Sequence, residues 1–137
     1  VIPELGKTLS GVTTLPVTVS PEGMALEYDM ELKTKGEVKV IVRFSPTLNF
    51  NDSGLRYAIG FDSDNEQIIN INGHYKGELG EWQANHVIDS STIHVIKEAE
   101  KHTLRIRPLD AGLVFQKIQI DLGGLKTSYL GAPETLK

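Results

Sequence analysis

The sequence predicts an all-β fold, an antiparallel β-sandwich formed by one domain of 137 residues. Several short segments alternate apolar and polar side chains with a period of two, which is the pattern of strands with one buried face. Gly, Pro, Asn and Asp fall between these segments, as turns require. No segment has the i, i+3, i+4, i+7 spacing of a long amphipathic helix. Together these features predict about seven to nine strands.

The N-terminal part begins with extended or looping backbone and leads into a strand. Residues 1–23 are rich in Gly, Pro and Thr, and Val17 and Val19 are expected to add at most a short edge strand. Residues 24–32 (MALEYDMEL) are apolar at almost every even position. They form the most clearly predicted strand of the chain.

A returning strand and a loop follow. Residues 34–37 (TKGE) have turn chemistry, and residues 38–44 alternate again, which predicts an antiparallel hairpin. Residues 45–54 read as a loop that carries Leu48 and Phe50 among polar side chains.

The middle of the chain predicts a second hairpin and a long polar excursion. Residues 55–61 alternate, residues 62–65 (DSDN) form a turn, and residues 67–71 pair back. Residues 72–84 are polar and Gly-rich, and residues 85–91 read as a short helical turn or a strand.

The last predicted strands are separated by turn residues. Ile93 and Val95 are the apolar residues of one strand, and residues 102–107 alternate before Pro108 ends the next. Residues 110–112 (DAG) form a turn, and a final strand ends at Asp121. This order is typical of galactose-binding-like and jelly-roll sandwiches, the architecture of many carbohydrate-binding modules.

Composition excludes several functions. The formal charge of −4 argues against a nucleic-acid partner, which would require a basic surface. No apolar run approaches the roughly 20 residues of a membrane span, and no signal peptide is visible. The absence of cysteine excludes disulfides and thiol chemistry. Because the sequence starts at Val1, we expect it to be a piece of a longer polypeptide.

Several motifs resemble the C-terminal domain of glycoside hydrolase family 115, the xylan α-glucuronidases. The resemblance extends over almost the whole chain, in unchanged order. The matching segments are IPELGKT (2–8), LEYDMEL (26–32), SPTLNFNDSGLRYAIGFD (45–62), residues 82–91, HTLRIRPLDAGLVFQKIQIDLGGLK (102–126) and SYLGAPE (128–134).

Small departures from the family pattern fall in loops. Residues 110–112 read Asp-Ala-Gly where the family has Asp-Pro-Gly, and residues 131–133 read Gly-Ala-Pro in place of Gly-Pro-Pro. His86 occupies a position where the family has Asn. These changes bear on ligand contacts made by the loops and leave the fold prediction intact.

The resemblance implies an accessory domain. In family 115 enzymes the catalytic region is separate and includes an α/β barrel, so residues 1–137 are expected to be one accessory domain without catalytic activity. The implied parent is a bacterial hydrolase that acts on glucuronoxylan or a related plant polysaccharide outside the cytoplasm, in the periplasm or the extracellular space. Expected partners are xylan-type polysaccharide and the other domains of the parent.

Catalytic and metal sites find little support in the residues. A glycosidase needs two carboxylates across the scissile bond, and no acidic pair stands out. No G-x-S-x-G nucleophile elbow occurs. Asp62, Asp64 and Glu66 alternate as oxygen donors and are candidate Ca²⁺ ligands, although the same residues fit a hairpin turn. No other metal or cofactor is expected.

Sugar binding is the better-supported hypothesis, with candidates mainly in the 72–86 excursion. Trp82 and Tyr75 are candidates for stacking on pyranose rings, although packing in the core or against another domain, for example as a plug at one end of the sandwich, fits Trp82 better. Tyr28 and Tyr57 lie on apolar strand faces and are predicted to be core. The candidate polar contacts are Asn72, Asn85, His86 and Arg105.

Two functions therefore remain open. The preferred prediction is a carbohydrate-binding accessory module for xylan or glucuronoxylan. The alternative is a structural or dimerisation domain of an α-glucuronidase, without a ligand of its own.

Overall fold

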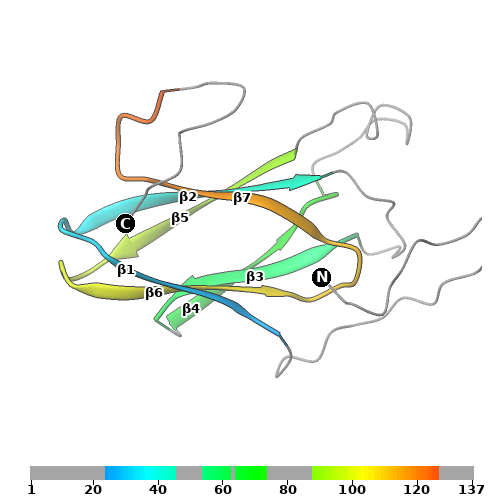
Figure 1. Ribbon diagram of the computed structural model, residues 1–137, viewed down its shortest axis with the longest axis horizontal. Coiled ribbons are helices and arrows are strands. Elements are labelled where there is room, and N and C mark those ends of the chain that lie inside the picture. The colour runs from blue at the N-terminus through cyan, green and yellow to red at the C-terminus, as the bar shows by residue number, and fades with distance from the viewer. Residues whose placement is uncertain (1–23, 46–53, 63, 74–87, 127–137) are drawn as a thin grey trace, which may run out of the picture.

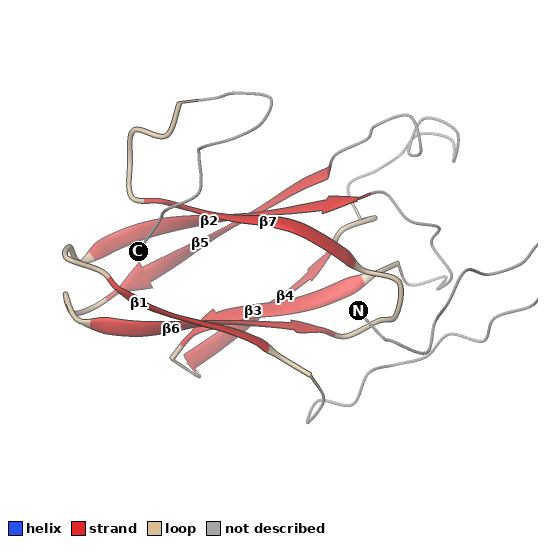
Figure 2. Cartoon of the chain, in the orientation of Figure 1, coloured by secondary structure: helices blue, strands red, loops and turns tan. Residues whose placement is uncertain are grey.

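A computed structural model describes residues 24–45, 54–62, 64–73 and 88–126. These residues form antiparallel strands and turns, without helix (Figure 2). The strands are β1 (Leu26–Glu31), β2 (Gly36–Ser45), β3 (Arg56–Phe61), β4 (Asp64–Asn70), β5 (Ile88–Ile96), β6 (Lys101–Pro108) and β7 (Val114–Asp121).

The strands build two sheets that face each other, which confirms the predicted sandwich (Figure 1). One sheet has the order β1-β6-β3-β4 and the other has the order β5-β2-β7. Gln67 of β4 donates its amide Nε2–H to the carbonyl of Ile93 in β5 at 2.8 Å, so these two edge strands border the same flank. The opposite flank is bordered by β1 and β7, which Figure 1 shows in front of the other strands.

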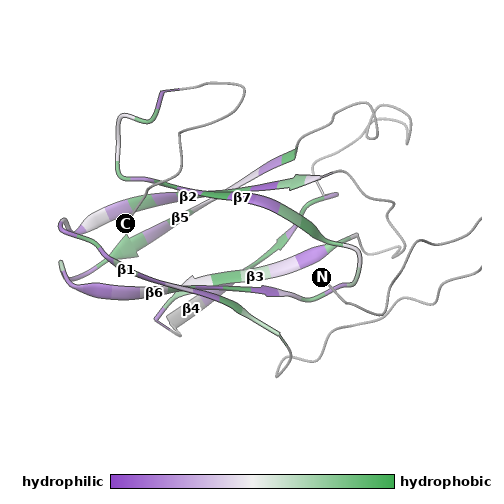
Figure 3. Ribbon diagram, in the orientation of Figure 1, coloured by the Kyte–Doolittle hydropathy of each residue, from purple (hydrophilic) through white to green (hydrophobic). Residues whose placement is uncertain are grey.

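The core lies between the sheets and follows from the alternation of the central strands (Figure 3). Val38, Val40, Val42 and Phe44 of β2 point inward and are at most 1% exposed. They meet the inward residues of β3 and β6, such as Ile106, which is fully buried. Full burial of such a side chain contributes about 1.5–3 kcal/mol, so this row of contacts holds the two layers together.

The turn between β6 and β7 is fixed by a buried carboxylate. Asp110, only 2% exposed, accepts hydrogen bonds from the backbone N–H of Arg56 and from its guanidinium Nε–H, both at 2.8 Å. Gly112 has a φ of 94°, which favours glycine because it lacks a Cβ. The Asp-Ala-Gly turn predicted from the sequence is thus confirmed, and its aspartate ties the turn to β3.

The prediction for the tyrosines holds for one and is wrong for the other. Tyr57 is fully buried, as predicted, and its ring lies 5.1 Å from that of Phe44. Tyr28 is 44% exposed, although its Cα partner Leu104 on β6 is fully buried. The reason is that β1 is the outermost strand of the larger sheet, so its inward face extends beyond the cover of the smaller one.

A similar correction applies to β5. Its apolar residues Ile93 and Val95 are 59% and 68% exposed, while Thr92 and His94 face the core. The predicted edge strand at Val17 and Val19, the loop residues Leu48 and Phe50, and residues 85–87 lie outside the described residues.

Candidate functional site

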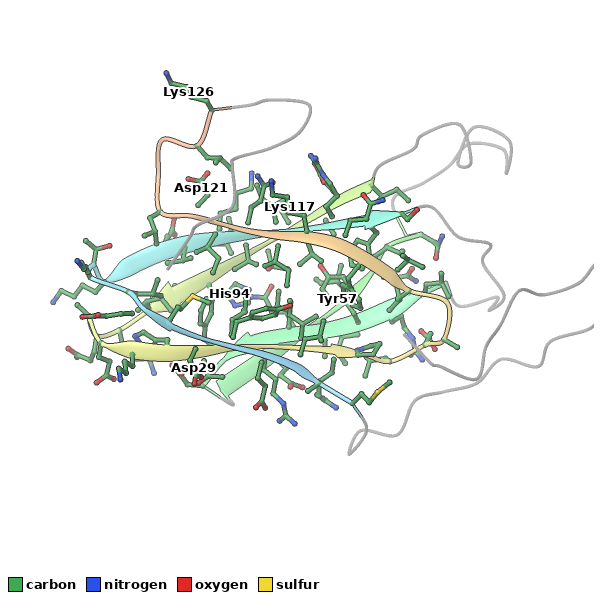
Figure 4. The ribbon with its side chains drawn as sticks, viewed as in Figure 1. Asp29, Tyr57, His94, Lys117, Asp121 and Lys126 are labelled. Carbon is green, nitrogen blue, oxygen red and sulfur yellow. The ribbon has the colours of Figure 1, made fainter. Side chains whose placement is uncertain are left out.

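The inward face of β5 is a row of polar side chains in an otherwise apolar interior. Ser90, Thr92 and His94 alternate along it, opposite Val42, Val40 and Val38 of β2. Buried polar groups are costly unless they are hydrogen-bonded, so each needs a partner across the interior. Figure 4 shows His94 and Tyr57 between the two layers and Asp29 outside them.

Each polar residue of this row has a hydrogen-bond partner, either across the interior or within the row. The hydroxyls of Ser90 and Tyr57 share a hydrogen bond of 2.7 Å. Burial raises the pKa of the Tyr57 phenol, partly offset by this bond. The Nε2 of His94 lies 2.8 Å from the Thr92 hydroxyl, and its Nδ1 faces the Gln67 amide at 3.5 Å.

His94 is a neutral imidazole. Burial lowers its pKa, because the charged form would lose its hydration. Gln67 presents its Nε2–H toward the His94 Nδ1, so Nδ1 is the acceptor and the ring proton sits on Nε2, donated to Thr92. His94 thus presents an uncharged ring, which stacks edge-on against Phe61 with 5.3 Å between centroids.

His102 is the charged counterpart at the same end of the sandwich. Its Nδ1 lies 2.5 Å from an Asp62 carboxylate oxygen, and its Nε2 lies 2.9 Å from the carbonyl of Glu98. Both partners are acceptors, so this arrangement favours the protonated ring, in which both nitrogens donate. The hydrogen bond to Asp62 is the main cause that raises the pKa of His102.

Asp62 has the complementary shift. Burial acts to raise the pKa of its carboxyl group, but hydrogen bonds from His102 and from the backbone N–H of Thr103 outweigh burial and lower it. Asp62 adopts a φ of 53°, in the left-handed region that aspartate tolerates better than most residues. This backbone geometry lets one carboxylate reach both partners.

His94, His102 and Asp62 border a cleft of about 610 Å³ on the flank of β4 and β5. We call it the β4/β5 cleft. Its walls are Phe61, Gln67, Ile93, His94 and Val95, and the turn after β5 adds two lysines and two glutamates: Lys97, Glu98, Glu100 and Lys101. The volume lies within the range of small-molecule sites. The lining also includes the ion pair of Asp62 and His102, so acidic and basic side chains both border the cleft.

Most of the residues predicted for sugar binding cannot be placed. Trp82, Tyr75, Asn85 and His86 lie outside the described residues. Asn72 is described, and its side-chain Oδ1 accepts the backbone N–H of Leu55 at 2.7 Å. This bond ties the segment after β4 to the start of β3, which gives Asn72 an anchoring role in the loop.

Arg105 lies on the outer face of the larger sheet. It is the Cα partner of Gly60 on β3 and of Glu27 on β1, whose carboxylate lies 3.2 Å from its Nε. Leu55, held by Asn72, is five residues from Gly60, which is about 16 Å along a strand. Asn72 and Arg105 thus lie at different positions along the larger sheet, and a sugar contact by either residue stays a prediction.

The candidate calcium ligands are engaged in different places. Asp62 binds His102, while Glu66 pairs with the guanidinium of Arg107 on the outer face, which lowers the pKa of Glu66. Asp64 begins β4. Within the described residues, no group of three or more His, Asp or Glu side chains is arranged to hold a metal ion.

The sequence prediction missed the β4/β5 cleft. Neither His94 nor His102 is among the residues predicted for sugar binding or for calcium. The sequence signal for the cleft was the alternation of the polar residues 90, 92 and 94. It was obscured because the apolar Ile93 and Val95 predict that the opposite face of the strand is buried.

Comparison with known proteins places the chain in a family. The model of the glycosyl hydrolase family 115 C-terminal domain matches residues 1–134. No curated protein matches the chain. Among the described residues, no helix is long and apolar enough to cross a membrane.

A solved structure supports the fold. It is described as a novel family GH115 4-O-methyl-α-glucuronidase with specificity for decorated arabinogalactans, and it superposes with a TM-score of 0.61 at 18% identity. The match covers 79% of this chain but 16% of that protein, so this chain spans a small part of it. At this identity the likeness shows a shared fold, whereas the family assignment rests on the match over residues 1–134. This chain belongs to the glycosyl hydrolase family 115 C-terminal domain family.

Proposed function

We propose that this domain is a non-catalytic carbohydrate-binding module of a polysaccharide-degrading enzyme, with xylan and glucuronoxylan as the first ligands to test. The observation that supports it best is the β4/β5 cleft, which combines the apolar side chains of Ile93 and Val95 with the polar side chains of Lys97, Glu98 and Glu100. Sugars present both hydroxyls and apolar C–H faces, so they need both kinds of surface. A plant polymer is met outside the cytoplasm, which makes the periplasm or the extracellular space the proposed location.

A binding role fits the chemistry of the acidic residues better than a catalytic one. A glycosidase acid must be able to hold or release a proton near the scissile bond. Asp62, Glu66 and Asp110 are instead each paired with a cationic side chain of the fold: His102, Arg107 and Arg56. Catalysis is therefore assigned to other domains of the proposed parent enzyme.

Two candidate sites compete for the ligand. The β4/β5 cleft lies at the end of β5 that contains His94. Tyr75 and Trp82, predicted from the sequence, lie outside the described residues. Single substitutions in either set can distinguish the two sites.

Affinity electrophoresis and calorimetry against glucuronoxylan, arabinoxylan, arabinogalactan and cellulose test the proposal. Ile93→Glu puts a charge into the exposed wall of the cleft and should weaken binding at least tenfold. Ile68→Glu is the matched control, because Ile68 is 65% exposed and lies on the outer face of the other sheet. Trp82→Ala tests the excursion.

The outcomes separate the sites and the function. Loss of binding in Ile93→Glu, with Ile68→Glu unchanged, supports the cleft, whereas loss only in Trp82→Ala moves the site to the excursion. If the folded wild-type domain binds none of the glycans, the carbohydrate-binding proposal is wrong.

The alternative is a structural or dimerisation role in an α-glucuronidase. Such a role needs an apolar surface for a neighbour, and one observation favours it: the exposed apolar residues of β1, Leu26 and Tyr28, on the flank opposite the cleft. The structural alternative therefore requires that another domain or a second copy of the chain packs against Leu26 and Tyr28.

A further inference from the structure

The turn after β4 contains an Asn-Gly pair, Asn72-Gly73, which is the only such pair in the sequence. Asparagine is most prone to deamidation when glycine follows it, because glycine has no side chain to shield its backbone nitrogen and its backbone is conformationally free. Asn72 is half-buried and Gly73 is exposed, so water reaches this side of the turn. Every other asparagine of the chain precedes a residue that has a side chain.

The reaction requires only the chain and water. The backbone nitrogen of Gly73 attacks the Cγ of Asn72, and the new N–C bond closes a five-membered succinimide. The side-chain nitrogen of Asn72 leaves as ammonia and takes the amide proton of Gly73. Water then opens the ring at either carbonyl. The products carry aspartate or isoaspartate at position 72, each with a carboxylate in place of the neutral amide.

Three hydrogen bonds hold the pair away from the reactive arrangement. The Oδ1 of Asn72 accepts the backbone N–H of Leu55 at 2.7 Å. The backbone N–H of Asn72 donates to the Oδ1 of Asn70 at 3.0 Å, and that of Gly73 donates to the carbonyl of Asn70 at 3.3 Å. Before attack, the side chain of Asn72 has to release Leu55 and turn its Cγ onto the nitrogen of Gly73. That nitrogen has to release Asn70.

We propose that Asn72-Gly73 is a deamidation site whose rate is set by local opening of the turn formed by residues 70–73. The turn is closed from both sides of Leu55, whose N–H is bound by Asn72 and whose carbonyl accepts the N–H of Ile71 at 2.9 Å. Loop ends open locally at a lower free energy than the whole domain unfolds. The site therefore reacts slowly in the folded chain and fast once the turn is open.

Conversion has a structural consequence at the start of β3. Isoaspartate adds a methylene to the main chain, so the carboxylate no longer meets the N–H of Leu55 in the same geometry. Leu55 is 1% exposed, and a buried N–H without a partner is costly. Asn72 is also a predicted polar contact to sugar, where the new charge would replace an amide. The inference itself is independent of the carbohydrate-binding proposal, because it concerns the covalent chemistry of the chain alone.

Peptide mapping by mass spectrometry tests the proposal on the full chain, incubated at mildly alkaline pH. We expect residue 72 to convert before every other asparagine. The rate should rise at least about tenfold in guanidinium chloride, where the bonds of the turn are absent. In the purified isoaspartate form, the amide of Leu55 should exchange with solvent faster than in the unconverted chain.

Gly73→Ala is the variant that tests the attacking nitrogen. The fold has room for it, because a Cβ at Gly73 would lie 3.4 Å from the carbonyl oxygen of Asn70, an ordinary contact. The new methyl group shields the backbone nitrogen. Conversion of Asn72 should therefore be largely lost in this variant, both in the folded chain and in denaturant.

Asn70→Ala tests the role of the turn. It removes the acceptor for the N–H of Asn72 and should speed conversion in the folded chain roughly fivefold, the factor that corresponds to a typical net hydrogen bond. In denaturant the rate should equal that of the wild type. Ile68→Ala is the matched control, because Ile68 lies on the same strand and is 65% exposed, so neither rate should change.

Three results would overturn the proposal. The first is a folded wild type in which residue 72 converts no faster than the other asparagines. The second is a Gly73→Ala variant that converts as fast as the wild type, which would exclude attack by this nitrogen. The third is a folded-state rate that stays the same in denaturant or in Asn70→Ala, which would show that the turn does not control the reaction. Unchanged amide protection in β2 and β6 shows that each variant remains folded.

Discussion

The hydroxyl pair of Tyr57 and Ser90 makes a sharp prediction about the polar interior. Tyr57 is fully buried, and its hydroxyl lies 2.7 Å from that of Ser90. Tyr57→Phe keeps the ring against Phe44 and removes only the hydrogen bond, which costs about 1 kcal/mol. Ser90→Ala leaves the buried phenol without this partner and should cost about 1–3 kcal/mol.

The double variant should cost no more than the costlier single variant, because removing both hydroxyls leaves neither one unpaired. The expected coupling is therefore about 1 kcal/mol. Urea unfolding at pH 7 of the wild type and the three variants measures the four free energies. A loss of about 1 kcal/mol corresponds to a Tm decrease of roughly 3–5 °C for a domain of this size. If the cost of the double variant equals the sum of the two single costs, the hydroxyls do not interact and the reasoning is refuted.

Two further predictions concern pH and a glycine. The raised pKa of His102 gives stability that is present below its ordinary value of 6.5 and is lost as pH rises through the folded value. The lowered pKa of Asp62 gives stability that is present above 3.8 and is lost as pH falls through the folded value. Asp62→Asn should therefore lower the unfolding free energy most between pH 3.8 and 6.5. The ion pair is contradicted if the difference in unfolding free energy between the wild type and this variant is constant from about pH 4 to 9. The titration of His94 affects the wild type and the Asp62→Asn variant equally, so it does not contribute to the difference between their unfolding free energies. Gly54→Ala should lower the unfolding free energy measured in urea by about 1–3 kcal/mol. The reasons are that φ of Gly54 is +84° and that the new Cβ would lie 2.3 Å from the Oδ1 of Asn70. An unchanged urea midpoint would show that the Asn70 side chain moves aside without cost.

Much of the architecture could be read from the sequence, because alternation and turn residues are local signals. The strands around Val40, Ile59 and Leu104 have a period of two, bounded by residues such as Gly36 and Pro108. These features predicted the sandwich and most strand positions.

The candidate site could be predicted only in part. Arg105 and Asn72 were predicted as polar contacts to sugar, and the structure shows what each contacts within the fold: Arg105 pairs with Glu27, and Asn72 accepts the N–H of Leu55. The pairing of Asp62 with His102 joins residues forty positions apart, which no local pattern reveals.

The sequence by itself determined the fold class, the family and the alternation of each strand, because these depend on the order of residues along the chain. Only the tertiary structure decided which face of each strand is buried. Leu26 and Tyr28 belong to an apolar row but are exposed, since β1 extends past the smaller sheet. His94 is buried and Val95 exposed because β5 faces the interior with its polar side, where Gln67 crosses to it from β4. Burial depends on what the other sheet covers, and that is fixed only when the two sheets pack.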